Sequence, residues 1–215
     1  MPGVSRPLPI GVLISGQGTN LRAILQRCED GQLDAVVRVV ISNRSDAAGL
    51  QFGRERDIPT FVCTRADYPG RSEQQLAMRD LLLRHEIELV VLAGFDQLLG
   101  DEFLAPFRYR IINLHPSLLP AFGGGMHAAR DALAYGVKVT GCTVHFVSAD
   151  IEGADSGPII VQEAVAVEEE DTETSLLDRI HAAEHRILPA AIQLVAENRL
   201  RVEGRRVHVL SKSWS

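Results

Sequence analysis

The stretch Pro9-Ile10-Gly11-Val12-Leu13-Ile14-Ser15-Gly16-Gln17-Gly18-Thr19-Asn20 decides the fold class of this 215-residue chain. Its first half is a compact apolar run, typical of a buried strand, and its second half is a glycine-rich turn. Residues 21–28 then repeat apolar side chains at helical spacing, at Leu21, Ile24, Leu25 and Cys28. A strand, a glycine turn and a helix in this order predict a βα unit.

The same alternation continues through the first two-thirds of the chain. Apolar runs predict further strands at 36–42, 60–63, 89–93 and 110–113. Helical patterns between and after them predict helices at 47–56, 71–85 and 126–135. Near-continuous apolar strands joined by helices are typical of a parallel sheet that is covered on both faces.

The pattern changes after residue 140. Predicted strands at 140–147 and 158–167 are separated only by a loop, so they can pair antiparallel. A long helix over 172–198, which contains Pro189, and short strands within 200–210 complete the chain. The sequence therefore predicts an α/β fold: a doubly wound, mostly parallel twisted sheet, Rossmann-like, with antiparallel C-terminal strands.

Composition narrows the class of protein. With 46% hydrophobic and 23% charged residues, we expect one domain over 9–210, a disordered lead at 1–8 and a tail at 211–215. No apolar run approaches the roughly 18 residues of a membrane span, and the first nine residues do not resemble a signal peptide. A net charge of −6 argues against a nucleic-acid partner. Three scattered cysteines form neither a disulfide framework nor a metal site, which favours the cytoplasm.

The run Asn113-Leu114-His115-Pro116-Ser117-Leu118-Leu119-Pro120 follows a predicted buried strand. Residues i and i+2 of a strand face the same side, so Asn113 and His115 should project together. An amide beside an imidazole can stabilise charge and move protons at a reacting carbonyl. Alone, such a pair is more often a structural feature that satisfies loop backbone.

Four other positions carry possible chemistry. The turn at Gly16–Asn20 offers backbone N–H groups to a phosphate, with Thr19 or Asn20 as a helix cap, but it lacks the third glycine of a dinucleotide site. His145 lies inside a strand, where histidines are usually structural. Asp155 precedes Ser-Gly-Pro and is either a turn residue or a partner that favours the His115 imidazolium. Glu184 either binds an amine or lies on a solvated helix face.

Taken together, these segments resemble the phosphoribosylglycinamide formyltransferases, folate-dependent enzymes of purine synthesis. The resemblance covers about residues 9–205. The matching segments are Leu13–Leu21, Ile41–Asn43, Val91–Phe95, Asn113–Pro120, Gly141–Val147, Asp155–Ile159 and Glu184–His185. The combination of Asn-x-His-Pro-Ser-Leu-Leu-Pro with a later Asp-x-Gly-Pro is highly specific.

The resemblance implies transfer of a formyl group from 10-formyltetrahydrofolate to the amine of glycinamide ribonucleotide, without a metal, by a monomer or homodimer. Asn113, His115 and Asp155 would form the catalytic group. The ribonucleotide would be bound by Gly18, Thr19, Asn20, His181, Ala182, Ala183 and Glu184. The folate would be bound by Arg71, Asp96, Gln97, Leu98, Leu99, Asn113, Ile151, Glu152, Gly153, Ala154 and Asp155.

The chain departs from the family pattern at three places. Asp96-Gln97 replaces a usual Met-Arg pair beside the pterin. Gly123-Gly124-Gly125 makes the loop before His127 one residue longer, and the loop after His145 is about three residues longer. That second insertion makes Asp150 a competitor of Asp155 for the catalytic role.

Three alternatives remain open at the level of sequence. A formyltetrahydrofolate deformylase would share the catalytic group, but we expect it to carry an additional N-terminal domain. A methionyl-tRNA formyltransferase would need an RNA-binding C-terminal domain. A folate- or nucleotide-binding protein without turnover is the third, favoured only by Asp96-Gln97 and the longer loops.

Overall fold

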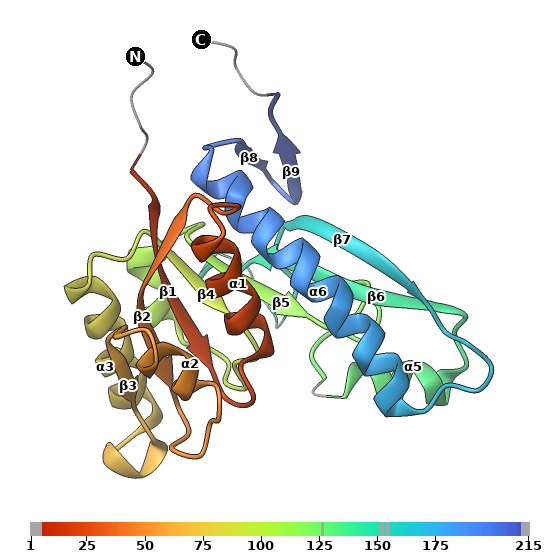
Figure 1. Ribbon diagram of the computed structural model, residues 1–215, viewed down its shortest axis with the longest axis horizontal. Coiled ribbons are helices and arrows are strands. Elements are labelled where there is room, and N and C mark those ends of the chain that lie inside the picture. The colour runs from red at the N-terminus through yellow and green to blue at the C-terminus, as the bar shows by residue number, and fades with distance from the viewer. Residues whose placement is uncertain (1–5, 126, 151–152, 154, 212–215) are drawn as a thin grey trace.

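A computed structural model describes residues 6–125, 127–150, 153 and 155–211. A seven-stranded sheet in the order β3-β2-β1-β4-β5-β6-β7 forms its centre (Figure 1). The strands are β1 (Leu8–Ile14), β2 (Ala35–Ser42), β3 (Thr60–Val62), β4 (Leu89–Leu92), β5 (Ile111–His115), β6 (Val139–Phe146) and β7 (Ile159–Ala166). A separate hairpin pairs β8 (Leu200–Glu203) with β9 (Arg206–Val209).

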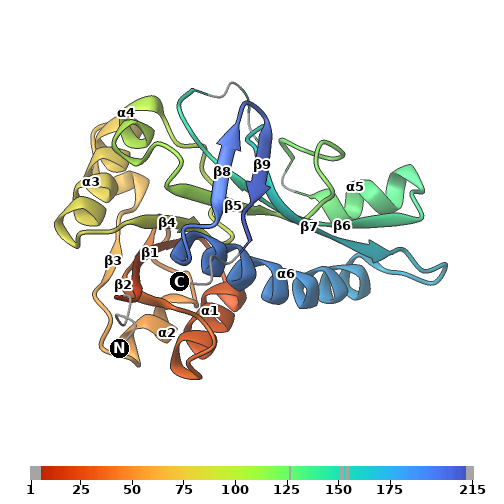
Figure 2. The ribbon, with the colours of Figure 1, turned by 90° about the horizontal axis from the view of Figure 1, so that it is seen from above.

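The five strands from β3 to β5 pair in parallel, whereas β6 and β7 pair antiparallel. The helices are α1 (Thr19–Glu29), α2 (Leu50–Arg54), α3 (Arg71–Arg84), α4 (Asp101–Leu104), α5 (Ala128–Tyr135) and α6 (Glu173–Ala196), with 3₁₀ turns η1 (Arg65–Asp67) and η2 (Ala105–Phe107). Figure 2 shows helices on both faces of the sheet. This arrangement confirms the predicted fold class.

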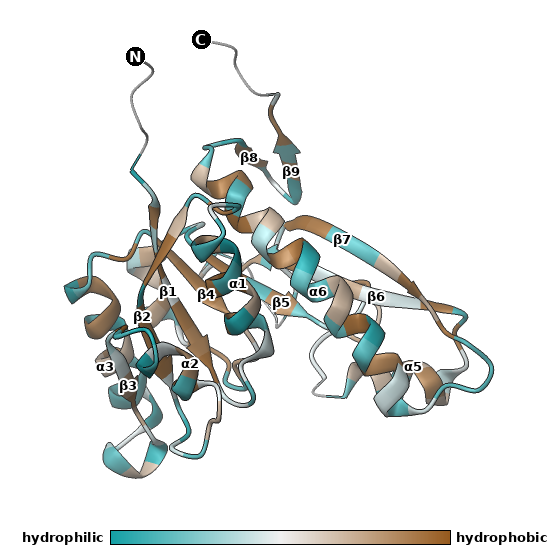
Figure 3. Ribbon diagram, viewed as in Figure 1, coloured by the Kyte–Doolittle hydropathy of each residue, from teal (hydrophilic) through white to brown (hydrophobic). Residues whose placement is uncertain are grey.

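Strand alternation divides the core into two layers, because neighbouring residues of a strand point to opposite faces. In β1, Ile10, Val12 and Ile14 pack in the layer that contains side chains of α1 and α6, whereas Leu13 packs with Met78 of α3 in the other. The apolar colouring of the central strands in Figure 3 follows from burial on both faces.

Several predicted boundaries were wrong. The helix expected over 47–56 is reduced to the five residues of α2, which has Gly49 as its N-cap and contains Gly53, a residue of low helix propensity. Strand β5 extends two residues further than expected, and Pro116 then ends it. The sequence patterns did not predict α4. The expected start of α5 at Met126 lies outside the described residues.

Long helix α6 runs through Pro189 without ending there. Within the described part of the chain, no helix is both long and apolar enough to cross a membrane.

Candidate active site

Strand β5 places Asn113 and His115 at the carboxyl end of the parallel part of the sheet, where open α/β folds bind ligands. Strand β5 pairs with β4 on one side and with β6 on the other. Its register with β6 places Asn113 opposite His145 and His115 opposite Thr143. Thr143 Oγ1 donates to the carbonyl of Ser117 at 2.6 Å, so β6 also fixes the turn that follows His115. The motif is therefore held by the sheet on both sides.

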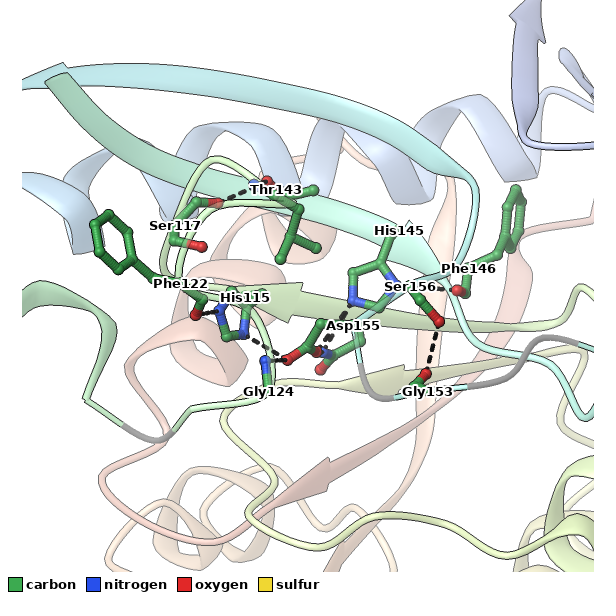
Figure 4. Close-up of polar contacts among 12 residues, drawn as sticks. His115, Ser117, Phe122, Gly124, Thr143, His145, Phe146, Gly153, Asp155 and Ser156 are labelled. Atoms are coloured by element: carbon green, nitrogen blue, oxygen red, sulfur yellow. Dashed lines mark hydrogen bonds and ion pairs between the residues drawn. The ribbon is translucent and has the colours of Figure 1, made fainter. Parts of the chain in front are cut away.

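Asp155 lies between the two histidines (Figure 4). Its Oδ2 is 3.2 Å from His115 Nδ1 and accepts a hydrogen bond from the Gly124 amide at 2.8 Å. Its Oδ1 accepts from Asn113 Nδ2 at 3.1 Å and is 3.5 Å from His145 Nε2. One carboxylate thus links both ends of the predicted catalytic group.

Burial by itself raises the pKa of Asp155, but the net shift is downward. The hydrogen bonds from His145 and from the Gly124 amide, together with the positive charge of the two imidazoles, outweigh the loss of solvation. Asp155 is therefore a carboxylate at neutral pH. Its φ of +54° is a left-handed conformation that is uncommon outside glycine, which marks a constrained position.

Both ring nitrogens of His115 face hydrogen-bond acceptors. Nδ1 faces Asp155, and Nε2 lies 3.0 Å from the carbonyl of Phe122. A protonated ring can donate to both acceptors at once, whereas a neutral ring can donate to only one. Phe122 and Gly124 bring the glycine-rich loop onto the catalytic group, since one contacts His115 and the other Asp155.

His145 belongs to this cluster, although its place inside a strand predicted a structural role. Its Nδ1 is 3.0 Å from the carbonyl of Phe146, and its Nε2 is 3.2 Å from Asn113 Nδ2. Gly157 lies close against the same carbonyl, so a side chain there would collide with it. The sequence signal for His145 was its alternation with Thr143 and Val147, which could be used only once its pairing with β5 was known.

The structure separates the two carboxylates that compete for the catalytic role. Asp150 forms an exposed ion pair with Arg108 at 2.6 Å. Asp155 instead contacts Asn113, His115 and His145. The register chosen from Ser-Gly-Pro places the carboxylate that contacts the histidines at 155.

A cavity of about 340 Å³ adjoins this group. Leu114 and Pro116, on either side of His115, contribute to its wall. The other lining residues are Gly16, Gln17, Gly18, Thr19, Asn20, Ala93, Gly94, Leu177, His181 and Glu184.

The glycine turn forms the floor of this cavity at the N-terminus of α1. Gly18 is the N-cap, with φ +70°, and no side chain caps the helix. The expected cap by Thr19 or Asn20 was therefore wrong, because the helix already begins at Thr19 and Asn20 Nδ2 instead donates to Glu184 Oε2 at 2.9 Å. Uncapped N–H groups at a helix start favour an anion.

Glu184 is buried on α6 and faces the turn. Burial raises its pKa, against the opposing effects of the Asn20 hydrogen bond and the charge of His181. Oδ1 of Asn20 is buried without a partner among the described residues. Ala182 is exposed and Ala183 lies in the apolar core, so the helix presents only His181 and Glu184 of the four predicted residues to the cavity.

A second cavity of about 440 Å³ is lined by three of the eleven predicted folate residues, Arg71, Leu98 and Leu99. Gln75 also lines it, and Arg71 donates to the carbonyl of Leu98. Asp96 does not line it but contacts Ser15 and Asn43. The amide oxygen of Gln97 is buried without a partner in the described ranges.

The remaining predicted folate segment is only partly described. Gly153 adopts φ +91°, and its carbonyl accepts a hydrogen bond from Ser156 Oγ at 2.7 Å. Ile151, Glu152 and Ala154 lie outside the described residues.

Comparison with known proteins places this geometry in a family. Residues 9–192 match the formyl transferase family model. A phosphoribosylglycinamide formyltransferase from Mycobacterium tuberculosis is 42% identical over 201 residues, covering 94% of this chain and 91% of that protein. The human trifunctional purine biosynthetic protein adenosine-3 is 44% identical over 187 residues. The chain spans 18% of that human protein.

Solved structures agree. Glycinamide ribonucleotide transformylase 1 from Symbiobacterium toebii has a TM-score of 0.93 at 49% identity, with 98% of each chain covered. A formyltetrahydrofolate deformylase from Pseudomonas syringae has a TM-score of 0.88 at 26% identity, covering 96% of this chain and 67% of that one. The chain therefore belongs to the formyl transferase family, among the phosphoribosylglycinamide formyltransferases.

Proposed function

We propose that the protein transfers the formyl group of 10-formyltetrahydrofolate to the primary amine of glycinamide ribonucleotide. This proposal rests on the observation that two different groups of residues line one cavity. The glycine-rich turn and a buried carboxyl group, Glu184, line one part, and the residues flanking His115 line another. A phosphorylated amine held there lies beside a group suited to acyl transfer.

The ribonucleotide phosphate would lie against the turn, where the N–H groups of Gly18, Thr19 and Asn20 and the α1 dipole favour an anion. Glu184 and the unpartnered Oδ1 of Asn20 are acceptors for the amine end of the substrate. Because both are buried, a polar substrate is needed to satisfy them.

The folate would bind from the side of Arg71 and Leu98. Arg71 lies in the second cavity and is placed to meet a carboxylate of the glutamate tail. The loop from Asp96 to Leu99 would form one edge of the pterin site, and Gly153 and Asp155 would contribute to the other. The carbon to be transferred would then lie next to Asn113 and His115.

The chemistry begins when the amine attacks the formyl carbon and an oxyanion develops on its oxygen. Asn113 and protonated His115 donate hydrogen bonds to that oxygen, and Asp155 keeps the imidazolium charged and oriented. Collapse of the tetrahedral intermediate breaks the bond between the formyl carbon and folate nitrogen. The proton lost by the amine moves to that nitrogen through His115 or water.

The donors must be released before they can act. Asn113 Nδ2 now donates to Asp155 and lies 3.2 Å from His145 Nε2, and His115 Nε2 faces the Phe122 carbonyl. Substrate binding would exchange one Asn113 hydrogen bond and the Phe122 contact for the formyl oxygen. Positioning two substrates end to end supplies much of the acceleration, because it replaces a bimolecular encounter.

A specific observation favours the deformylase as a second candidate. The fold is shared at a TM-score of 0.88, and a water molecule could replace the amine in the same cluster. The two functions are separated by following the absorbance of 10-formyl-5,8-dideazafolate with and without glycinamide ribonucleotide. Deformylation that requires the ribonucleotide supports the transferase, whereas deformylation at the same rate without it supports the hydrolase. Binding of both ligands without any reaction would support a non-catalytic protein.

A further inference from the structure

Asp96 begins the loop 96–100, which includes residues proposed to bind the folate. Its side chain is 28% exposed and turns away from the cavity, toward the ends of β1 and β2. Ser15 is the first residue after β1, and Asn43 is the first after β2. The segments that follow β1, β2 and β4 thus meet at one place, through Ser15, Asn43 and Asp96.

The contacts form a closed ring. The Asp96 amide donates to Ser15 Oγ at 2.9 Å, Ser15 Oγ donates to Asn43 Oδ1 at 2.6 Å, and Asn43 Nδ2 donates to Asp96 Oδ1 at 2.7 Å. Ser15 Oγ is also 2.9 Å from Asp96 Oδ1, but a hydroxyl has one proton to donate. The carboxylate fixes the orientation of Asn43, because a flipped amide would set its oxygen against a negative charge.

The ring fixes the start of the folate loop, and a second clamp fixes its end. Gln75, buried on α3, donates through Nε2 to the Leu98 carbonyl at 2.8 Å. Its Oε1 accepts from the Gly100 amide at 2.8 Å. Residues 96–100 are thereby attached at both ends to elements of the sheet and its helix layer.

The glycine turn at 16–20 has anchoring contacts of its own outside this ring. The Gly49 amide donates a hydrogen bond to the Gly16 carbonyl at 3.0 Å, and Gly18 packs directly against Gly49. Loss of the ring should therefore move the folate loop and leave the ribonucleotide side in place.

We propose that Asp96 is a positioning residue that locks the folate-binding loop onto the ends of β1 and β2 through Ser15 and Asn43. This inference rests on the proposed function for its substrate. The Asp96 carboxylate points into the hydrogen-bonded ring, where Asn43 donates to it, so its negative charge does not face the pterin.

The test compares Asp96→Ala with Asp96→Asn and Arg44→Ala. Arg44 Nη1 lies 3.6 Å from the Asp96 carboxylate but is exposed and outside the ring, so it is the matched control. Asp96→Asn keeps an oxygen that accepts from Asn43. We expect Asp96→Ala to raise the KM for 10-formyl-5,8-dideazafolate about tenfold, as for loss of one hydrogen bond to a charged group, and to leave the KM for glycinamide ribonucleotide within about twofold.

Asp96→Asn and Arg44→Ala should stay within about threefold of the parent for both substrates. Hydrogen exchange of residues 96–100 should quicken in Asp96→Ala alone. An unchanged folate KM in Asp96→Ala, an equal rise in both KM values, or an effect of Asp96→Asn as large as that of Asp96→Ala would each overturn the inference. Equilibrium binding of 5,8-dideazafolate gives the same comparison without turnover, so it remains decisive even if the parent protein transfers no formyl group.

Discussion

Replacing Asp155 by asparagine removes the charge that joins Asn113, His115 and His145. The groups facing its oxygens are the Gly124 amide at 2.8 Å, Asn113 Nδ2 at 3.1 Å and the two imidazoles at 3.2 and 3.5 Å. An asparagine presents an NH₂ group to one pair of these donors and loses the charge on both.

Hydrogen bonds to charged groups contribute about 1.5–3 kcal/mol, and about 1.4 kcal/mol corresponds to a tenfold change in rate. We therefore expect Asp155→Asn to lower kcat by about 10- to 150-fold, because the imidazolium loses its counter-ion. The KM for glycinamide ribonucleotide should change little, since the cavity lining does not include Asp155. Steady-state kinetics at saturating folate measures both quantities.

A stability measurement checks the same residue independently of turnover. The folded-state pKa of Asp155 is lowered, so its ionisation stabilises the fold above the pKa of an unfolded aspartate, about 3.9. That contribution is lost as the pH falls through the lower, folded-state pKa. The difference in unfolding free energy between the parent and Asp155→Asn should therefore narrow when urea titrations are carried below about pH 4.

Asp150→Asn is the control, because Asp150 is an exposed carboxylate paired only with surface Arg108 among its described contacts. Its kcat should stay within about twofold of the parent, as expected for an exposed ion pair. A large loss at Asp150 with none at Asp155 would refute the reasoning.

Three further predictions follow from buried groups. Because ionised Glu184 is destabilised by burial, Glu184→Gln should raise the Tm at pH 7–8, where the parent bears this cost, and raise the KM for the ribonucleotide about tenfold; a lower Tm would contradict this. Gly18→Ala should destabilise the fold by at least about 1–2 kcal/mol in chemical denaturation because of its positive φ, whereas Gly16→Ala, with open space around an added Cβ, should not. Burial raises the pKa of the Cys142 thiol to about 12 and that of Cys28 to about 11, so thiol titration at pH 8 should be slow until the protein is unfolded.

The sheet could be predicted because the composition of its strands reflects how deeply they are buried. The run 89–92 is apolar and buried on both faces, and only a strand covered by helices on both sides needs that composition. The position of Asn113 and His115 on the same face of β5 could also be predicted, because it depends only on alternation within one strand.

Features that depend on contacts between distant segments could not be predicted in this way. His145 joins the cluster because of the register between β6 and β5, and the sequence of neither strand alone determines that register. The ring at Asp96 needs Ser15 and Asn43 from two other strands. The close approach of Gly53 in α2 to Val40 is likewise a tertiary contact that a helical pattern does not contain.

The fate of the formyl carbon tests the central claim most directly. The protein is mixed with 10-[¹³C]formyl-5,8-dideazafolate and glycinamide ribonucleotide, and the label is followed by ¹³C NMR. Transfer by the cluster of Asn113, His115 and Asp155 predicts one formamide carbon on the ribonucleotide for each dideazafolate released, and no such product from His115→Ala that still binds the ribonucleotide. Label that appears as formate at the same rate with and without the ribonucleotide, or a His115→Ala variant with parental turnover, would contradict it.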